Sequence, residues 1–414
     1  MSYITSDSVV TVVFELSWES AHAAHVERYY ADGVSFVRDI LPLGLKSRMR
    51  GLGVGDSVEM AIDQSEVPEF KPGKVLDMPL ARFKAPFIHN RKLRPRLGRF
   101  YPQHLIESVP GTRPDSDAPF RVVETDQIGF KADLNHPMAG RDVRIRARVL
   151  EIRPPSGASG VLRRWSDILF SGPGMQAQLP DAATDFFGDE PFARDEEPFA
   201  RNEESGEALS RAVPRQWPRL DSRARACVVN IHAGLLRDGM DILDLMAGRD
   251  SHLPGGLAPA SVTGLGVNAQ ELAANPLLTA SVVHNINQDP ELPFAEASFD
   301  AVVCSLAVEY LTRPFEVFAD AARVLRPGGV FVLTFSNRWF EPGVVRVWTE
   351  LLEFERMGLV SHYLAHTEGF GDVRTISERG WPRPAEAGDD TEAAHAEHST
   401  RSDPVYAVWA RLNG

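Results

Sequence analysis

The stretch DILDLMAGRDSHLP, residues 241–254, holds the side chains whose types and spacing best fit a ligand site. A short apolar segment, 242–245, runs into a loop that has Asp244 at its head and Gly248 inside it. A loop beyond the carboxyl end of a strand lets backbone N–H groups approach a ligand closely, and glycine permits that approach. We therefore predict that this loop binds a cofactor.

Candidates for moving a proton or holding an acidic group follow the same region. His252 titrates near neutrality and could accept a proton, although a histidine there could also simply pack at a helix start. Arg215 and Arg338 could hold a carboxylate through paired hydrogen bonds, and the alternative for both is a salt bridge within the protein. The candidate catalytic residues are His252, Tyr310 and Asp221, and the candidate substrate-binding residues are Arg215, Asp250, Asn337 and Arg338.

The elements that must position these side chains alternate between strand and helix. Near-continuous apolar runs typical of buried strands cover 242–245, 262–267, 282–286, 299–305 and the residues after a turn at Gly328-Gly329. Helical spacing covers 220–236, a segment from Gln270, and 315–325. Apolar strands with helical crossovers predict a parallel sheet that is buried on both faces.

Three segments of this half resemble class I S-adenosylmethionine-dependent methyltransferases: LPF at 292–294, SFDAVVC at 298–304 and RVLRPGG at 323–329. The terminal segment DPVYAVWAR fits the antiparallel end of that fold. The S-H-L-P of the first loop and the S-N-R after the fifth strand are similar to an uncharacterised, type 11-like methyltransferase group. The resemblance implies a Rossmann-like α/β domain over 211–414, with S-adenosylmethionine as methyl donor and no metal.

The resemblance also implies which residues touch the cofactor. Gly248 matches the second of the family's three glycines, whereas Met246 and Asp250 occupy the other two positions and make the loop bulkier. The acid that usually holds the ribose hydroxyls falls at Gly266, and Asn268 could supply that hydrogen bond instead. The alternative is a methyltransferase fold that has lost its cofactor. The implied cofactor-binding set is Asp244, Met246, Gly248, Asn268, Asn285, Ile286, Asn287 and Cys304.

Methyl transfer from a sulfonium is an in-line displacement, so the acceptor must be aligned and must lose a proton unless it is already an anion. The Asn-Pro-Pro-Tyr motif of amide-nitrogen methylation is absent after the fourth strand, where the run is CSLAVEY, 304–310. We expect Cys304 to be a small buried residue and not a nucleophile. Tyr310 could line the site or simply pack at a helix start.

The first 155 residues have different signals. Alternation of apolar and charged residues at 143–152 predicts a half-buried antiparallel strand, β-branched residues predict a strand at 9–16, and Asp32-Gly33 predicts a turn. Segments 41–56 and 133–140, the latter DLNHPMAG, resemble the SlyD-type branch of FKBP-like peptidyl-prolyl isomerases. That resemblance implies an α+β domain over 1–155 with a flap inserted at about 70–128.

This resemblance has two departures that disfavour isomerase activity. The Ala-Tyr-Gly usual in that branch is absent from 61–75, and the aromatic usual in the last strand is Ile145. A binding or chaperone-like module that holds a polypeptide is the favoured role. His136 is expected to stabilise a turn. The basic run at 82–99 is expected to be a solvated flap face, with docking on the protein's own acidic linker as the alternative.

An acidic, flexible linker is predicted at 156–210. It contains EPFAR twice, at 190–194 and 197–201, and Phe192 and Phe199 could fasten it to a domain. The net charge of -13 argues against a nucleic-acid partner. Without a signal peptide or an apolar run of about 20 residues, we expect a cytoplasmic protein with no membrane segment.

We thus expect a methyltransferase acting on a small molecule, such as a thiol or a carboxylate-bearing nucleophile. The alternatives are a protein-directed methyltransferase and a prolyl isomerase or chaperone.

Overall fold

The computed structural model divides the chain into two compact units. The first comprises 1–27, 31–191 and 350–359, and the second comprises 28–30, 192–349 and 360–414. The structure describes residues 2–84, 87–88, 91–92, 94–107, 109, 113, 115–116, 118–155, 160–172, 186–187, 198–201, 220–339, 343–384 and 400–414.

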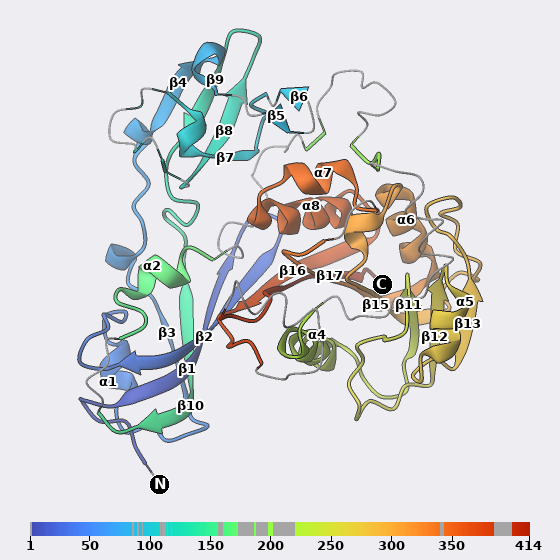
Figure 1. The fold of residues 1–414 in the computed structure, drawn as a ribbon, viewed down its shortest axis with the longest axis horizontal. Coiled ribbons are helices and arrows are strands. Elements are labelled where there is room, and N and C mark those ends of the chain that lie inside the picture. The colour runs from blue at the N-terminus through green and yellow to red at the C-terminus, as the bar shows by residue number, and fades with distance from the viewer. Residues whose placement is uncertain are drawn as a thin grey trace. The chain divides into compact units, whose positions relative to one another are not determined.

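The second unit is built on a sheet whose strand order is β13-β12-β11-β14-β15-β17-β16 (Figure 1). The first five strands in this order are parallel to their neighbours, and β17 is antiparallel to both β15 and β16. This arrangement confirms the predicted parallel sheet with an antiparallel end. The strands are β11 (Asp241–Leu245), β12 (Ser261–Gly266), β13 (Ala280–Val283), β14 (Phe299–Ser305), β15 (Leu325–Ser336), β16 (Phe370–Arg379) and β17 (Val405–Leu412).

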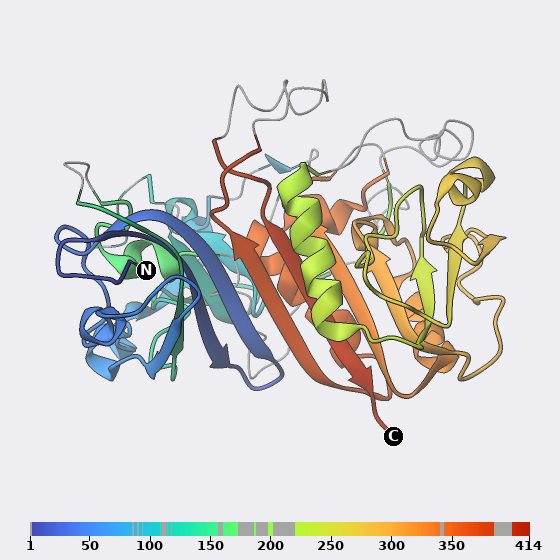
Figure 2. The same ribbon diagram turned by 90° about the horizontal axis from the view of Figure 1, so that it is seen from below.

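Helices cover both faces of this sheet. α4 (Ser222–Leu235) packs against β17 and β15, and Figure 2 shows it lying across the red strands. α6 (Pro314–Val324) packs against β15 on the other face, and its buried residues recur at helical spacing. The other helices in the described part of this unit are α5 (Ala269–Ala274), the 3₁₀ turn η6 (Val308–Tyr310), α7 (Arg346–Glu350) and α8 (Glu353–Ala365).

Two local differences from the predicted elements have steric or hydrogen-bonding causes. Gly328-Gly329 lies within β15 and not before it, and a Cβ on Gly329 would lie 2.8 Å from the carbonyl oxygen of Arg326, so glycine is required. β13 ends at Val283, three residues before the predicted end, because the chain turns at Asn285, whose carbonyl oxygen accepts from the N–H groups of residues 288 and 289.

The first unit contains an antiparallel sheet in the order β2-β1-β10-β3. β1 (Val9–Glu19) and β10 (Arg144–Arg153) pair along most of their length, and β3 is Ser57–Ala61. β2 (Ala24–Ser35) runs through Asp32-Gly33, so the predicted turn there is wrong; Gly33 takes a φ of 82° within the strand. The helices of this part are α1 (Leu45–Met49) and α2 (Trp165–Leu169).

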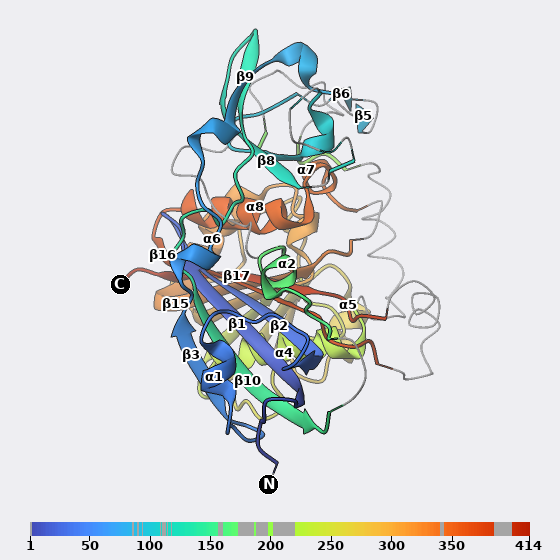
Figure 3. The ribbon, with the colours of Figure 1, turned by 90° about the vertical axis from the view of Figure 1, so that its left-hand side faces the viewer.

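A second sheet of the first unit, in the order β4-β9-β8-β7, is inserted between β3 and β10 (Figure 3). Its own core contains Phe83, Tyr101, Phe120 and Phe130. The strands are β4 (Val75–Pro79), β7 (Phe100–Pro102), β8 (Pro119–Thr125) and β9 (Gly129–Asp133), so the insert extends past the predicted end at 128. Short elements complete this unit: β5 (Phe87–Ile88), β6 (Arg91–Lys92), η1 (Gln64–Glu66), η2 (Pro72–Lys74), η3 (Leu80–Arg82) and η4 (Gln103–Leu105).

The basic run at 82–99 is not solvated throughout, contrary to the prediction. Arg99 is buried and its Nε lies 2.6 Å from Oε1 of Glu355, at the start of α8. The N–H of Phe100 donates to the same carboxylate oxygen, and the Phe100 ring packs edge-on against Phe354. Residues 350–359 group with the first unit, although they lie inside the predicted range 211–414.

His136 stabilises the predicted turn, because its Nδ1 accepts from the N–H of Met138. Cys227 and Cys304 are both buried and form no disulfide. Within the described ranges, no helix is long and apolar enough to cross a membrane, and no group of three His, Cys, Asp or Glu side chains is placed to hold a metal ion.

Candidate functional site

Asp244 lies at the carboxyl end of β11, as predicted, with 2% of its surface exposed. Burial raises the pKa of its carboxyl group to about 7, and the neighbouring hydroxyl of Ser251 opposes that rise. The second carboxylate oxygen, Oδ2, has no hydrogen-bond partner among the described residues. A buried oxygen without a partner is costly, so its surroundings are suited to a ligand that donates to it.

The loop after β11 holds backbone conformations that glycine usually takes. Met246 has a φ of 61° and His252 a φ of 52°, and at the end of β14 Leu306 has a φ of 55°. Such angles are unfavourable for residues with a side chain and cluster at ligand sites. Met246, where the family usually has glycine, therefore keeps the conformation of glycine despite its larger side chain.

Asn275, which sequence reasoning missed, fastens this loop to the end of α5. Its Nδ2 donates to the carbonyl oxygen of Gly248 and to the hydroxyl of Ser251, both over 2.9 Å. Asn275 is 5% exposed and Ser251 is fully buried. The 27 positions between Asn275 and Gly248 explain why no local pattern pointed to this contact.

Gly266 shows why the usual acid is missing after β12. A Cβ on Gly266 would collide with the carbonyl oxygen of Ala247. The N–H of Ala247 donates to the carbonyl oxygen of Leu265 over 2.8 Å, which holds the loop in this place. The first loop lies directly against this position and leaves no room for a side chain. Glycine at 266 is thus a steric requirement of the loop.

Asn268 has a structural task that the prediction did not include. Its Oδ1 accepts from the N–H groups of Gln270 and Glu271 and so caps the start of α5. Because this oxygen already accepts two hydrogen bonds, it is poorly suited to the predicted contact with ribose hydroxyls.

The segment after β13 ends near the turn η6. Asn287 donates from Nδ2 to the carbonyl oxygen of Tyr310 and accepts from the N–H of Thr312, so it braces η6. Asn285 accepts from the N–H of Asn287, while its buried Nδ2 has no partner among the described residues. Ile286 between them is buried. Asn285 is therefore the member of this trio best suited to a ligand.

His252 and Asp250, predicted for different tasks, lie together. Nδ1 of His252 is 3.2 Å from Oδ2 of Asp250, and the His252 N–H donates to Oδ1. The contact with His252 lowers the pKa of Asp250 to about 2. The carbonyl oxygen of His252 accepts from Nδ1 of His232 on α4, whose pKa burial lowers to about 4. Asp250 thus orients the His252 ring and is not placed as an independent substrate contact.

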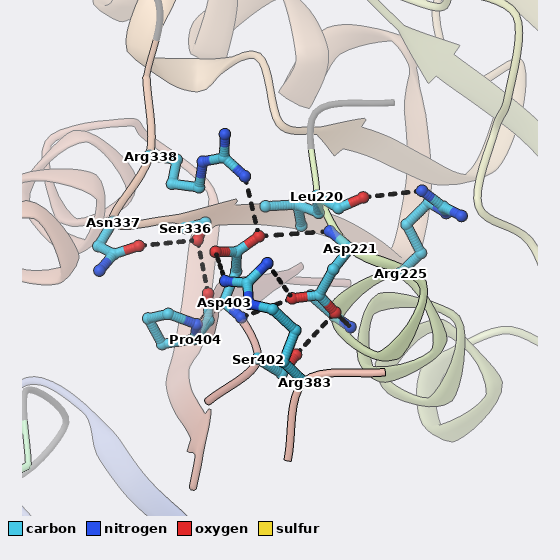
Figure 4. A network of polar contacts seen from close by, with 11 residues as sticks. Leu220, Asp221, Arg225, Ser336, Asn337, Arg338, Arg383, Ser402, Asp403 and Pro404 are labelled. Atoms are coloured by element: carbon cyan, nitrogen blue, oxygen red, sulfur yellow. Dashed lines mark hydrogen bonds and ion pairs between the residues drawn. The ribbon is translucent and has the colours of Figure 1, made fainter. Parts of the chain in front are cut away.

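Asp221 is part of a network of acids and arginines at the start of α4 (Figure 4). It caps the helix by accepting from the N–H of Ala224, and it also accepts from Ser402 and Asp403. Arg383 lies 3.5 Å away. These contacts occupy both carboxylate oxygens, so the geometry does not support the predicted role of Asp221 as a catalytic residue.

The segment after β15 joins the same network. Nη1 of Arg338 is 3.1 Å from Oδ2 of Asp403, so Arg338 makes the salt bridge that was the alternative to a substrate contact (Figure 4). Asn337 accepts from the hydroxyl of Ser336 and is half-buried. Arg215 lies outside the described residues.

Cys304 is buried at the end of β14, as expected. The next residue, Ser305, has a buried hydroxyl without a partner among the described residues. Tyr310 is buried in η6, and its carbonyl oxygen accepts from Arg201 of the linker. Phe199 packs against Phe315 and a second aromatic ring, Tyr363, which confirms that it fastens the linker. Phe192 lies outside the described residues.

Three of the buried polar atoms without a partner among the described residues lie at one edge of the sheet. Asp244 Oδ2 and Ser305 Oγ lie at the carboxyl ends of β11 and β14, and Asn285 Nδ2 follows the carboxyl end of β13. A hydrogen-bond acceptor, a donor and a hydroxyl together suit a ligand that carries both donors and acceptors, such as an amino acid joined to a nucleoside. The residues present therefore fit the implied cofactor.

Residues 250–333 match the family model described as "Methyltransferase domain". This part of the chain is thus similar to methyltransferase domains. The sheet around it is parallel with an antiparallel end, as the sequence predicted.

Relatives are similar to this chain over limited lengths. A ubiquinone/menaquinone biosynthesis C-methyltransferase of Haemophilus ducreyi is 29% identical over 33% of this chain and 53% of its own. An uncharacterized methyltransferase of Mycobacterium avium is 32% identical over 30% and 47%. A demethylmenaquinone methyltransferase of Renibacterium salmoninarum is 30% identical over 36% and 59%. The chain thus spans about half the length of the relatives it matches.

Proposed function

We propose that this protein is an S-adenosylmethionine-dependent methyltransferase that acts on a small molecule. The observation that carries the proposal is the buried, partner-free Oδ2 of Asp244 at the edge of the sheet where this fold binds ligands. When bound, S-adenosylmethionine would supply an electrophilic methyl group that a nucleophile attacks in line, with S-adenosylhomocysteine as the leaving group.

The chain's own residues would divide the work of binding and proton transfer. Asp244 would accept hydrogen bonds from S-adenosylmethionine, and Asn285 would donate one to it through Nδ2. His252, held by Asp250, would take the proton that a neutral acceptor loses. Tyr310 and Asn337 remain the proposed acceptor contacts, whereas Arg338 is engaged by Asp403. The contact with Asp250 supports this role of His252, because the carboxylate orients the imidazole ring.

The acceptor is best described by its chemistry. A thiol or another group with an acidic proton gives an anion once His252 accepts that proton, and the anion is the nucleophile. One relative is named a ubiquinone/menaquinone biosynthesis C-methyltransferase and another a demethylmenaquinone methyltransferase. A ring carbon activated by a neighbouring acidic hydroxyl is therefore a further acceptor that we propose.

Calorimetric titration with S-adenosylmethionine and S-adenosylhomocysteine tests the cofactor site. We expect micromolar binding by the native protein and loss of binding in Asp244→Ala. The matched control is Asp238→Ala, in the segment before β11 and away from the sheet's carboxyl edge. Absence of binding by the native protein would refute the proposal. A screen with methyl-labelled donor then compares thiols, carboxylic acids and hydroxylated rings as acceptors.

A second candidate function concerns the first unit. Its antiparallel sheet carries an inserted sheet between β3 and β10, an arrangement that supports the resemblance to FKBP-like proteins of the SlyD type. A module of this kind would hold polypeptide, either for prolyl isomerisation or to present a protein acceptor for methylation. Ile145 is fully buried in β10, where the resemblance would place an aromatic ring, so we favour holding over isomerisation.

A prolyl-isomerisation assay on the full chain separates these alternatives. The small-molecule methyltransferase proposal expects no rate increase for a proline-containing peptide, whereas an isomerase would accelerate it. Transfer of labelled methyl to an unfolded protein, competed by excess peptide, would favour the protein-directed alternative.

A further inference from the structure

Residues 198–201, from the second EPFAR copy of the linker, are bound in a defined place on the second unit. The N–H of Arg346 donates to the carbonyl oxygen of Ala200 over 3.0 Å. The N–H of Val347 donates to the carbonyl oxygen of Pro198 over 2.8 Å. An antiparallel bridge between the same two segments accompanies these hydrogen bonds. The backbone of the linker is therefore paired with the segment where α7 begins.

Side chains of the bound copy make two further kinds of contact. The ring of Phe199 packs against the rings of Phe315 and Tyr363, with centroids 6.3 and 6.4 Å away. The guanidinium group of Arg201 donates to the carbonyl oxygen of Tyr310 in η6. Backbone pairing gives affinity for an extended peptide, and the side-chain contacts give specificity. The groups that contact this peptide form what we call the linker-docking site: residues 345–347, Phe315, Tyr363 and the carbonyl oxygen of Tyr310.

The first EPFAR copy carries the same groups in the same order, seven positions earlier in the chain. Every contact described above is made by the Pro-Phe-Ala-Arg part, which is identical in the two copies. The linker-docking site holds one such peptide at a time, so the two copies compete for it. A tethered copy has a high local concentration, which favours exchange within one chain. The exchange changes only the lengths of the segments before and after the site, and the free energy of loop closure varies slowly with length.

We propose that the linker-docking site binds either EPFAR copy, and that residues 190–194 occupy it when residues 197–201 leave it. The site is then a recognition surface for a Pro-Phe-Ala-Arg peptide, and the chain supplies two such peptides. Either copy brings an arginine to the carbonyl oxygen of Tyr310, so η6 keeps this hydrogen bond after the exchange. The proposal does not depend on a bound cofactor or on methyl transfer.

Amide hydrogen exchange of the full chain, observed by NMR with isotope-labelled valine, measures occupancy of the site. The N–H of Val347 donates to the bound linker. The N–H of Val345 donates to the carbonyl oxygen of Glu309 over 3.0 Å and is the internal reference. The ratio of the two exchange rates therefore reports binding of the linker separately from opening of the surrounding structure.

Three variants separate exchange of the copies from use of the second copy alone. In Phe199→Ala the first copy takes over, so the protection of Val347 should fall less than about threefold. Phe192→Ala should stay within the same limit. In the double variant neither copy has its ring, and the protection should fall about tenfold or more, since burial of an aromatic side chain contributes at least that factor to binding.

The matched control is the pair Phe187→Ala, Phe199→Ala. It also removes two rings, but Phe187 precedes both copies, so the first copy stays whole. This control should behave like Phe199→Ala alone. The proposal is overturned if Phe199→Ala alone loses as much protection as the variant that lacks both Phe192 and Phe199. Native protection in that double variant would overturn it as well.

An added peptide tests recognition directly. A synthetic peptide with the sequence of 189–195 should restore the protection of Val347 in the double variant, and the same peptide with alanine in place of phenylalanine should not. Equal effects of the two peptides would overturn the proposal. If the double variant does not fold, as judged by its thermal transition, a photoreactive phenylalanine analogue at position 192 of Phe199→Ala replaces it. We expect crosslinks to peptides that contain Phe315 or Tyr363, and their absence would overturn the proposal.

Discussion

Asn275 donates a hydrogen bond from Nδ2 to the carbonyl oxygen of Gly248 over 2.9 Å, and so ties the end of α5 to the first loop. The same nitrogen donates to the hydroxyl of Ser251. Asn275, at the end of α5, therefore holds the first loop in position. Its backbone angles at Met246 and His252 are unfavourable in isolation, and such conformations persist only where surrounding contacts hold them.

Asn275→Asp removes both of these donated hydrogen bonds with almost no change in size. We expect the affinity for S-adenosylhomocysteine to fall about tenfold or more, since each unsatisfied buried group costs about 1–3 kcal/mol. Titration calorimetry measures the loss. The control is Thr279→Val, directly before β13, which removes a hydroxyl that hydrogen-bonds to the backbone of Val262. Its affinity for S-adenosylhomocysteine should stay within about threefold of the native value. Equal binding by Asn275→Asp and the native protein would contradict this account of the loop.

Gly266→Asp introduces the acid that the methyltransferase resemblance places at this position. We expect it to abolish cofactor binding and not to improve it, because any Cβ there displaces Ala247 and the loop. Gly256→Ala is the control, since a Cβ at that position meets nothing within 4 Å. Binding by Gly266→Asp as tight as that of the native protein would show that the loop can move aside.

Burial of Asp244 predicts a pH-dependent stability. Its pKa is about 7 in the folded protein and about 4 when unfolded, so the folded state binds more protons between these values. The free energy of unfolding should therefore decrease as pH rises from about 4 to about 7, by about 1.4 kcal/mol per pH unit from this group. Asp244→Asn lacks the effect.

Denaturant titrations at several pH values check this prediction. The difference in unfolding free energy between Asp244→Asn and the native protein should grow as pH rises to about 7 and then level off. Asp250, whose pKa is about 2, has the opposite sign, because its contribution is lost only as pH falls below about 4 toward 2. A difference that is independent of pH would mean that Asp244 stays ionised throughout.

Glu355→Gln should be strongly destabilising. It leaves the buried guanidinium of Arg99 without its counter-charge, and breaking one partner of a buried pair costs about 3–5 kcal/mol. Denaturant unfolding measures the change. Glu107→Gln breaks an exposed pair with Lys84 in the same unit and should cost less than about 1 kcal/mol. The double variant Arg99→Met, Glu355→Leu should recover much of the lost stability, and failure to do so would point to the shape of the side chains instead of their charge.

Local patterns in the sequence were enough to predict much of the second unit. β14 runs from Phe299 to Ser305 as predicted, because continuous apolar residues specify a strand buried on both faces. The site was predicted less well, because its contacts join residues far apart in sequence. The spacing of residues in the sequence does not reveal the hydrogen bond between Asn275 and Gly248. It also does not reveal that Ala247 leaves no space for a side chain at Gly266.

The first unit shows the same limit. Asp32-Gly33 is a common turn pair, yet β2 runs through it because the strand is stabilised by its neighbours and glycine allows the local irregularity. The basic run contained no feature that separated Arg99 from its exposed neighbours. Its partner lies 256 residues away, so only the folded chain identifies it.

The salt bridge of Arg99 bears on any attempt to dissect the chain. A fragment that stops at residue 155 keeps the buried arginine and loses Glu355, so it would fold, if at all, with an unmatched charge in its interior. Conversely, a fragment that starts at residue 211 leaves Phe354 without the Phe100 ring and Glu355 without Arg99. Residues 350–359, in the C-terminal half of the chain, thus stabilise the inserted sheet of the N-terminal half. Recombination of the two halves would therefore have to carry residues 350–359 along with the inserted sheet.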